Sequence, residues 1–141
     1  MKLGNYEFKQ TCSACPEQYD VFDKEGRQVA YVRLRWGSLY AACPDVGGTI
    51  IYSADIGNDD GCFRSDKQRF HHQRNIAERI EWYNFPIVCP DCGQRVVLEG
   101  DELEDYILDL EDVGKAVVEC PECYRFIKVR DDGDGVFICS R

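Results

Sequence analysis

The 141-residue sequence predicts an α+β protein built from two parts. Strand-like alternation runs from residue 5 to residue 54, helical periodicity appears in two later segments, and two Cys-x-x-Cys pairs lie in the second half. The first part, residues 1–85, is predicted to be an antiparallel β-meander covered by one helix. The second part, residues 86–141, is predicted to be organised around the cysteine pairs, with an acidic helix inserted between them.

Apolar and polar residues alternate in the first part, which predicts strands because successive side chains of a strand point to opposite faces of a sheet. The predicted strands are residues 5–9, 19–22, 28–35, 38–43 and 49–54. On the longest of them, the face expected to be buried comprises Ala30, Val32, Leu34 and Trp36. The short connections between the strands favour antiparallel pairing of neighbours.

A helix is predicted after the meander, over residues 66–83. Ser65 and Gln68 have the three-residue spacing of a capping box, which marks a helix N-terminus. The stripe expected to face the sheet comprises Phe70, Gln73, Ile76, Ala77, Ile80 and Tyr83. Pro86 disfavours helical backbone at the residue before it, so the boundary between the two parts is expected at residues 84–88.

The two Cys-x-x-Cys pairs predict a metal site made of Cys89, Cys92, Cys120 and Cys123. Two cysteines three residues apart on a tight turn can both face one cation, and four thiolates are the donor set of structural zinc sites. With four protein ligands no position remains for a reactive water, so the predicted Zn²⁺ is structural. Disulfides or redox dithiols are the alternatives, although a redox Cys-x-x-Cys usually occurs singly beside a βαβ pattern.

The second part resembles zinc ribbons through these four cysteines. Strands are predicted at residues 95–99, 116–119, 125–130 and 136–139, and a helix at residues 101–113 is extra material that a ribbon does not require. Residues 11–36, together with residues 44–47, resemble small uncharacterised proteins of phages and prophages. That second resemblance implies a mobile-element origin and transfers no functional residue, and ribbon membership specifies no ligand.

Charge is uneven along the chain, whose net charge is −9. Residues 89–141 contain 6 Lys and Arg against 14 Asp and Glu, which disfavours non-specific binding to phosphate backbones. In the predicted 101–113 helix, Glu102, Asp105, Asp109 and Asp112 fall at helical spacing and line one face over about 15 Å. This acidic stripe is either an ordinary solvated face or a partner-binding surface that imitates a phosphate backbone.

A second cysteine set is a candidate for another metal ion. Its members are Cys12, Cys15, Cys43 and Cys62. Buried free cysteines are the plain alternative, and a redox dithiol formed by Cys12 and Cys15 is another.

These patterns predict a non-enzymatic, zinc-stabilised, protein-binding inhibitor of phage origin. It is expected to block a host nucleic-acid-handling machine, such as a CRISPR effector, by occupying its basic groove. No nucleophile elbow or phosphate loop occurs in the sequence, and the absence of a signal peptide or a long apolar segment predicts the bacterial host cytoplasm. The alternative is a nucleic-acid-binding or transcription-associated zinc ribbon. Its contact residues would be Arg33, Arg35, Lys67, Arg74 and Arg125, with Trp36 or Tyr124 stacking on bases.

Overall fold

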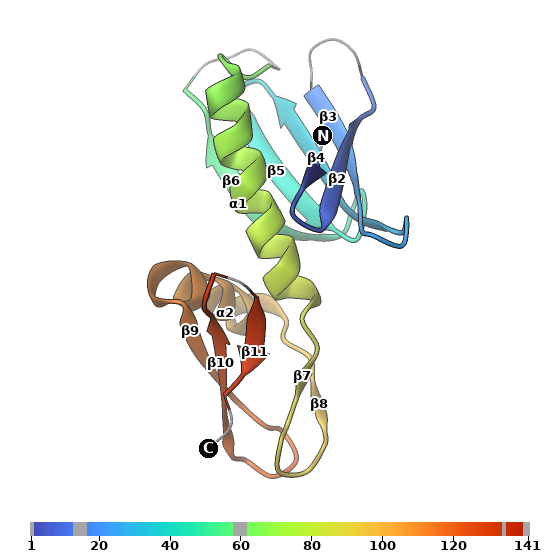
Figure 1. The fold of residues 1–141 in the computed structure, drawn as a ribbon. Helices are drawn as coiled ribbons and strands as arrows, with labels where there is room; N and C mark the ends of the chain where they lie inside the picture. The colour runs from blue at the N-terminus through green and yellow to red at the C-terminus, as the bar shows by residue number, and fades with distance from the viewer. Residues whose placement is uncertain (1, 13–16, 58–61, 134, 140–141) are drawn as a thin grey trace. The chain divides into compact units, whose positions relative to one another are not determined.

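The computed structural model describes residues 2–12, 17–57, 62–133 and 135–139. The chain has an α+β architecture with antiparallel sheets, and it divides into two compact units, Met1–Ile80 and Glu81–Arg141 (Figure 1). The division falls inside helix α1 (Asp66–Asn84), five residues before the predicted boundary. Among the described residues, no helix is long and apolar enough to cross a membrane.

The first unit contains a six-stranded antiparallel sheet whose strands follow one another in chain order. The strands are β1 (Lys2–Leu3), β2 (Tyr6–Gln10), β3 (Glu17–Phe22), β4 (Gln28–Arg35), β5 (Ser38–Cys43) and β6 (Thr49–Asp55). Strands β2 to β6 correspond to the five predicted segments. The short edge strand β1 was not predicted, because two residues are too few to show alternation.

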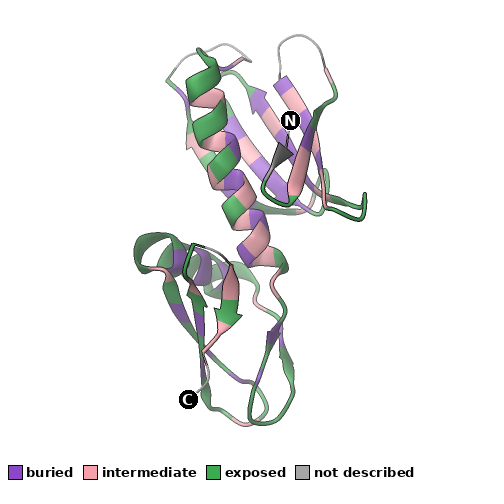
Figure 2. Cartoon of the chain, viewed as in Figure 1, coloured by how far each residue is buried: buried purple, intermediate pink, exposed green. Residues whose placement is uncertain are grey.

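The buried face of β4 is formed by Ala30, Val32 and Leu34, and Figure 2 shows buried positions recurring along the strands of this sheet. Trp36 does not belong to that face. It is 72% exposed, so the prediction that it is buried was wrong. Trp36 and Gly37 form the two-residue connection between β4 and β5, and both have positive φ, 50° and 76°. Such a turn matches the twist of a hairpin, and it carries the Trp36 side chain out of the sheet.

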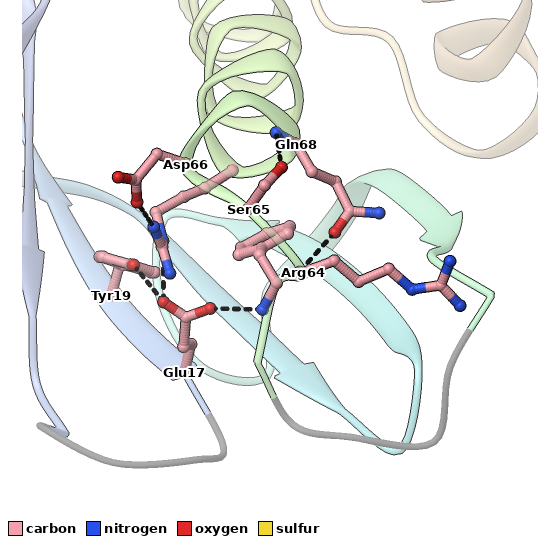
Figure 3. A network of polar contacts seen from close by, with 8 residues as sticks. Glu17, Tyr19, Arg64, Ser65, Asp66 and Gln68 are labelled. Atoms are coloured by element: carbon pink, nitrogen blue, oxygen red, sulfur yellow. Dashed lines mark hydrogen bonds and ion pairs between the residues drawn. The ribbon is translucent and has the colours of Figure 1, made fainter.

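Helix α1 begins as the capping box predicts. The Gln68 backbone N–H donates to Ser65 Oγ at 3.0 Å, while the Gln68 side chain accepts from the Arg64 backbone N–H at 2.8 Å (Figure 3). In a capping box the Gln68 side chain would accept from the N–H of Ser65, whereas here it accepts from the N–H of Arg64, the residue before the cap. On the inward side of the helix, Gln73, Ile76 and Ile80 are buried. Phe70 is 44% exposed, which contradicts its predicted place on the buried stripe.

A polar network attaches the start of α1 to the sheet within the first unit, with the buried Glu17 carboxylate at its centre (Figure 3). Oε1 accepts from Tyr19 Oη and from Arg69 Nε, both at 2.9 Å, and Oε2 accepts from the Phe63 backbone N–H at 2.7 Å. Arg69 also pairs with Asp66 one turn earlier. A buried carboxylate is tolerated here because a guanidinium and two further donors compensate for its lost hydration.

The second unit contains a hairpin, one helix and a three-stranded antiparallel sheet. The hairpin pairs β7 (Ile87–Val88) with β8 (Arg95–Val96), and it is followed by α2 (Gly100–Val113). The sheet has the order β11-β10-β9, formed by β9 (Lys115–Glu119), β10 (Phe126–Asp131) and β11 (Val136–Ile138).

Helix α2 lies against one face of this sheet and closes the core of the second unit (Figure 1). The buried side chains of the helix are Leu103, Tyr106, Ile107 and Leu110, and those of the sheet are Ala116, Val118, Ile127 and Val129. Trp82, in the last turn of α1, joins this core: its Nε1 donates to Asp131 Oδ2 at 2.6 Å, and its carbonyl accepts from Tyr106 Oη at 3.4 Å. These bonds explain why the last turn of α1 belongs to the second unit.

Candidate metal centre

The two Cys-x-x-Cys pairs form knuckles with the same backbone geometry, one between β7 and β8 and the other between β9 and β10. In the first knuckle, the Cys89 carbonyl accepts from Gly93 N–H and the Cys89 N–H donates to the Gln94 carbonyl, both at 2.9 Å. The second knuckle repeats both bonds at the same distance with the equivalent residues Cys120, Tyr124 and Arg125. The local fold thus holds each pair of cysteines on a closed loop.

The fourth residue after the leading cysteine has left-handed backbone in both knuckles. Gly93 has a φ of 77°, and Tyr124 has a φ of 60°. Glycine adopts this conformation freely, but a side chain makes it costly by roughly 1 kcal/mol. The side chain of Tyr124 is also 71% exposed, so its burial contributes little to offset that cost.

The four sulfur atoms converge on one point and can hold a metal ion. Their Sγ atoms all lie within 4.8 Å of one another, with 3.6 Å between Cys89 and Cys123 and 3.5 Å between Cys92 and Cys120. Tetrahedral coordination with metal–sulfur bonds of ~2.3 Å separates the sulfurs by ~3.8 Å. A disulfide requires ~2.05 Å. The spacing therefore fits one shared cation, and the structure brings together all four predicted ligands.

The surroundings of the sulfurs shift their pKa values in opposite directions, because desolvation and the neighbouring thiols raise the pKa of Cys92 and of Cys123. Backbone N–H groups of Cys92 and Asp91 point at the Cys89 sulfur and lower the pKa of Cys89 to about 7. Cys89 and Cys120 are buried, whereas Cys92 is exposed at the rim. Two buried cysteines and two closed knuckles are features of a site that can enclose an ion, and four sulfur donors would leave that ion no position for a water.

The second cysteine set is not brought together by the described residues. Among the described residues, the cysteines whose sulfur atoms cluster closely enough to hold a metal ion are Cys89, Cys92, Cys120 and Cys123. Cys43 is buried, and desolvation raises the pKa of its thiol to about 12, while Cys62 is disulfide-bonded. Cys12 is half-buried, and Cys15 lies outside the described residues. A second metal ion at Cys12, Cys15, Cys43 and Cys62 stays a prediction, and it requires the Cys62 disulfide to be reduced.

The acidic stripe lies on the solvent side of α2. Glu102, Asp105, Asp109 and Asp112 are all exposed, and none forms an ion pair within the described ranges. The anionic surface is also broader than predicted. Three more exposed carboxylates share the solvent side of the helix, namely Asp101, Glu104 and Glu111. Helical spacing alone could have identified them, because they occupy the positions that remain once the buried stripe is assigned.

Within the first unit, the basic residues proposed for nucleic-acid binding lie on two separate elements, β4 and α1. The sheet face that meets α1 carries Tyr19 and Val32. Alternation along β4 places Arg33 and Arg35 on the opposite face of the sheet. Lys67 and Arg74 lie on α1. Arg35 stacks over the ring of Trp36 at 4.0 Å, Arg74 is 4.0 Å from Glu78, and Arg125 pairs with Asp91 at 3.7 Å in the second unit.

No protein-family model, curated protein or solved structure matches this chain. The resemblance to phage and prophage proteins therefore has no support beyond the residues that suggested it. The function is therefore argued from the cysteine cluster and from the acidic stripe of the second unit.

Proposed function

We propose that the four cysteines bind one zinc ion and that the second unit is a zinc ribbon with α2 as its insertion. The donor set supports zinc, because four thiolates in tetrahedral spacing suit this ion and leave it no catalytic position. The ion would hold together a unit of about 60 residues, a size at which apolar burial supplies only ~3–5 kcal/mol. The metal centre is accordingly a scaffold, and function resides on the surface that it supports.

We further propose that the chain is a non-enzymatic inhibitor that binds a nucleic-acid-handling protein through the acidic stripe. The observation that supports this proposal is the exposure of Glu102, Asp105, Asp109 and Asp112 without ion-pair partners among the described residues. Carboxylates spaced along a rigid rod present negative charge to a groove shaped for a phosphate backbone. Their field also accelerates association with a basic partner.

The position of the stripe on α2 gives a second argument. The helix ends at Val113 with no basic residue in its last turn, so Asp112 lies beside the negative end of the helix dipole. Asp105, Asp109 and Asp112 also repel one another at spacings of four and three residues. The arrangement costs stability, and a binding role is a physical reason for retaining it.

A pull-down from a bacterial lysate tests this proposal, with the zinc-loaded full chain as bait. We expect capture of a basic nucleic-acid enzyme that high salt or competing DNA displaces, because both weaken charge pairing in a groove. In the test variant, the stripe is neutralised by Glu102→Gln, Asp105→Asn, Asp109→Asn and Asp112→Asn. Capture should then be lost while zinc content and helicity remain.

The matched control removes the same amount of charge elsewhere. Four exposed carboxylates away from the solvent side of α2 are neutralised by Glu25→Gln, Asp45→Asn, Glu99→Gln and Glu122→Gln. This control should retain the captured enzyme. Equal capture by the two variants, or recovery of nucleic acid in place of a basic protein, would contradict docking through the stripe.

A further inference from the structure

A groove of about 880 Å³ lies on the face of the second-unit sheet that α2 does not cover. The strand pairing defines the residues of this face: Arg130 on β10 lies opposite Lys115 on β9 and Phe137 on β11, and Lys128 lies opposite Val117. The buried residues of β9 and β10 alternate with these and point to the helix side. The outer face is therefore a separate surface of the same sheet.

This outer face is cationic although the unit as a whole is acidic. Lys115, Lys128 and Arg130 are exposed, and they form no ion pair with any described residue. Arg130 and Lys115 sit directly across from each other, and a like-charge pair in that position destabilises a sheet. An anion bound between them would remove the repulsion. One carboxylate, Glu119, stands on this face at the far end of β9, opposite Phe126.

Aromatic rings are interleaved with these cations. Phe126 is 70% exposed, Phe137 is 39% exposed, and Phe126, Lys128 and Arg130 occupy alternate positions of β10. Alternate residues of a strand are ~7 Å apart, so the face presents rings and cations in a row along β10. Tyr124, which keeps a costly left-handed backbone, adds another exposed ring just before this row.

We propose that the outer face of the β9–β10–β11 sheet binds single-stranded nucleic acid. Exposed cations that form no ion pair with a described residue complement a phosphate backbone, and the exposed rings between them offer stacking platforms for unpaired bases. A duplex keeps its bases stacked inside and cannot use those rings. This surface is distinct from the acidic stripe on α2, so it goes beyond the inhibitor proposal and is tested by other residues.

Fluorescence anisotropy of labelled oligothymidylate and oligouridylate, titrated with the zinc-loaded full chain, tests this surface. We expect binding that is tighter than binding to a duplex of equal length. Phe126→Ala should weaken it by roughly 5- to 150-fold, the range that loss of one stacking ring gives. Phe126→Tyr keeps the ring and should restore the affinity.

The cationic contribution is measured with Lys128→Gln and Arg130→Gln together. The slope of log affinity against log salt should become shallower by about 1.4, because each phosphate contact on a single strand contributes ~0.7. The matched control, Lys9→Gln with Lys24→Gln, removes the same charge from exposed positions in the first unit and should leave the slope unchanged. Zinc content and Trp82 fluorescence verify that each variant is folded.

Several results would overturn the proposal. One is the absence of oligonucleotide binding at low salt. Another is an equal loss of affinity in the two double variants, which would mean that binding depends only on net charge. Displacement by polyglutamate with no effect of Phe126→Ala would make the face an acidic-peptide site. Self-association that disappears with Lys128→Gln and Arg130→Gln would mean that a second copy of the chain covers the face. Neutralising the α2 stripe should strengthen oligonucleotide binding, which separates this surface from the inhibitor proposal.

Discussion

Removing negative charge from the end of α2 should stabilise the second unit. Asp112→Asn takes an anion away from the negative end of the helix dipole, an interaction of about 0.3–1 kcal/mol. Asp109→Asn removes repulsion with Asp105 and Asp112, each worth about 0.2–0.5 kcal/mol. Asn and Asp have similar helix propensities, so the combined gain is about 1 kcal/mol. A gain of that size should raise the Tm of this unit by about 4–8 °C.

Fluorescence of Trp82 reports this unfolding, because its indole is buried in the second unit and donates to Asp131. Trp36→Phe makes Trp82 the only tryptophan. The matched control is Asp101→Asn in the first turn of α2, where a carboxylate favours the helix dipole and its loss should lower the Tm. An equal rise in Tm for Asp101→Asn and Asp112→Asn would refute the dipole argument and leave only net charge. High salt should shrink both shifts.

Three further predictions concern the first unit, and each can be measured by chemical denaturation followed by circular dichroism. Glu17→Gln should lower the free energy of unfolding by about 2–4 kcal/mol, because Arg69 loses a buried charged partner. The control Glu25→Gln, at an exposed position, should leave this free energy almost unchanged. Equal losses in the two variants would contradict the argument from burial. Burial and, to a smaller extent, the hydrogen bond to Glu17 raise the pKa of Tyr19 from 10 to about 12. The unfolded chain therefore loses the tyrosine proton at a lower pH than the folded chain, and the free energy of unfolding falls as the pH rises from about 10 to 12. Tyr19→Phe should reduce this alkaline loss, and an unchanged pH profile would count against it. Gln73 is buried, and its side-chain amide has no hydrogen-bond partner in the described part of the chain. Gln73→Leu should therefore raise the free energy of unfolding by about 1–2 kcal/mol. A loss of stability in this variant would contradict the prediction.

Local sequence signals predicted most of the elements and the four cysteines of the candidate metal site. Alternation located β2 to β6, the Ser65 and Gln68 pair located the start of α1, and the spacing of four cysteines located both knuckles. Each of these signals is local, because alternation belongs to a single strand, the capping box closes within three residues, and backbone hydrogen bonds close each knuckle within five residues.

Features that depend on distant pairing were not predictable in the same way. Trp36 was expected to be buried because alternation ignores the turn that follows. Phe70 was expected to be buried because the inward stripe was drawn too wide: it lies roughly 90° round the helix from the centre of the buried Gln73, Ile76 and Ile80. The outer sheet face was missed for a related reason. Alternating Phe126, Lys128 and Arg130 is visible in the sequence, but only the pairing with β9 and β11 places Lys115 and Phe137 beside them.

The most direct test of the metal centre is removal of metal from the Trp36→Phe chain while Trp82 emission is followed. Structural zinc contributes about 10–16 kcal/mol in small zinc-binding peptides, more than the core of a unit this size supplies. We expect one zinc ion per chain, and a red shift of Trp82 emission when a chelator removes that ion, while the first unit keeps its circular dichroism. Emission that stays unchanged after complete metal removal, or a purified folded chain that contains no metal, would contradict the claim that the four cysteines hold the second unit together.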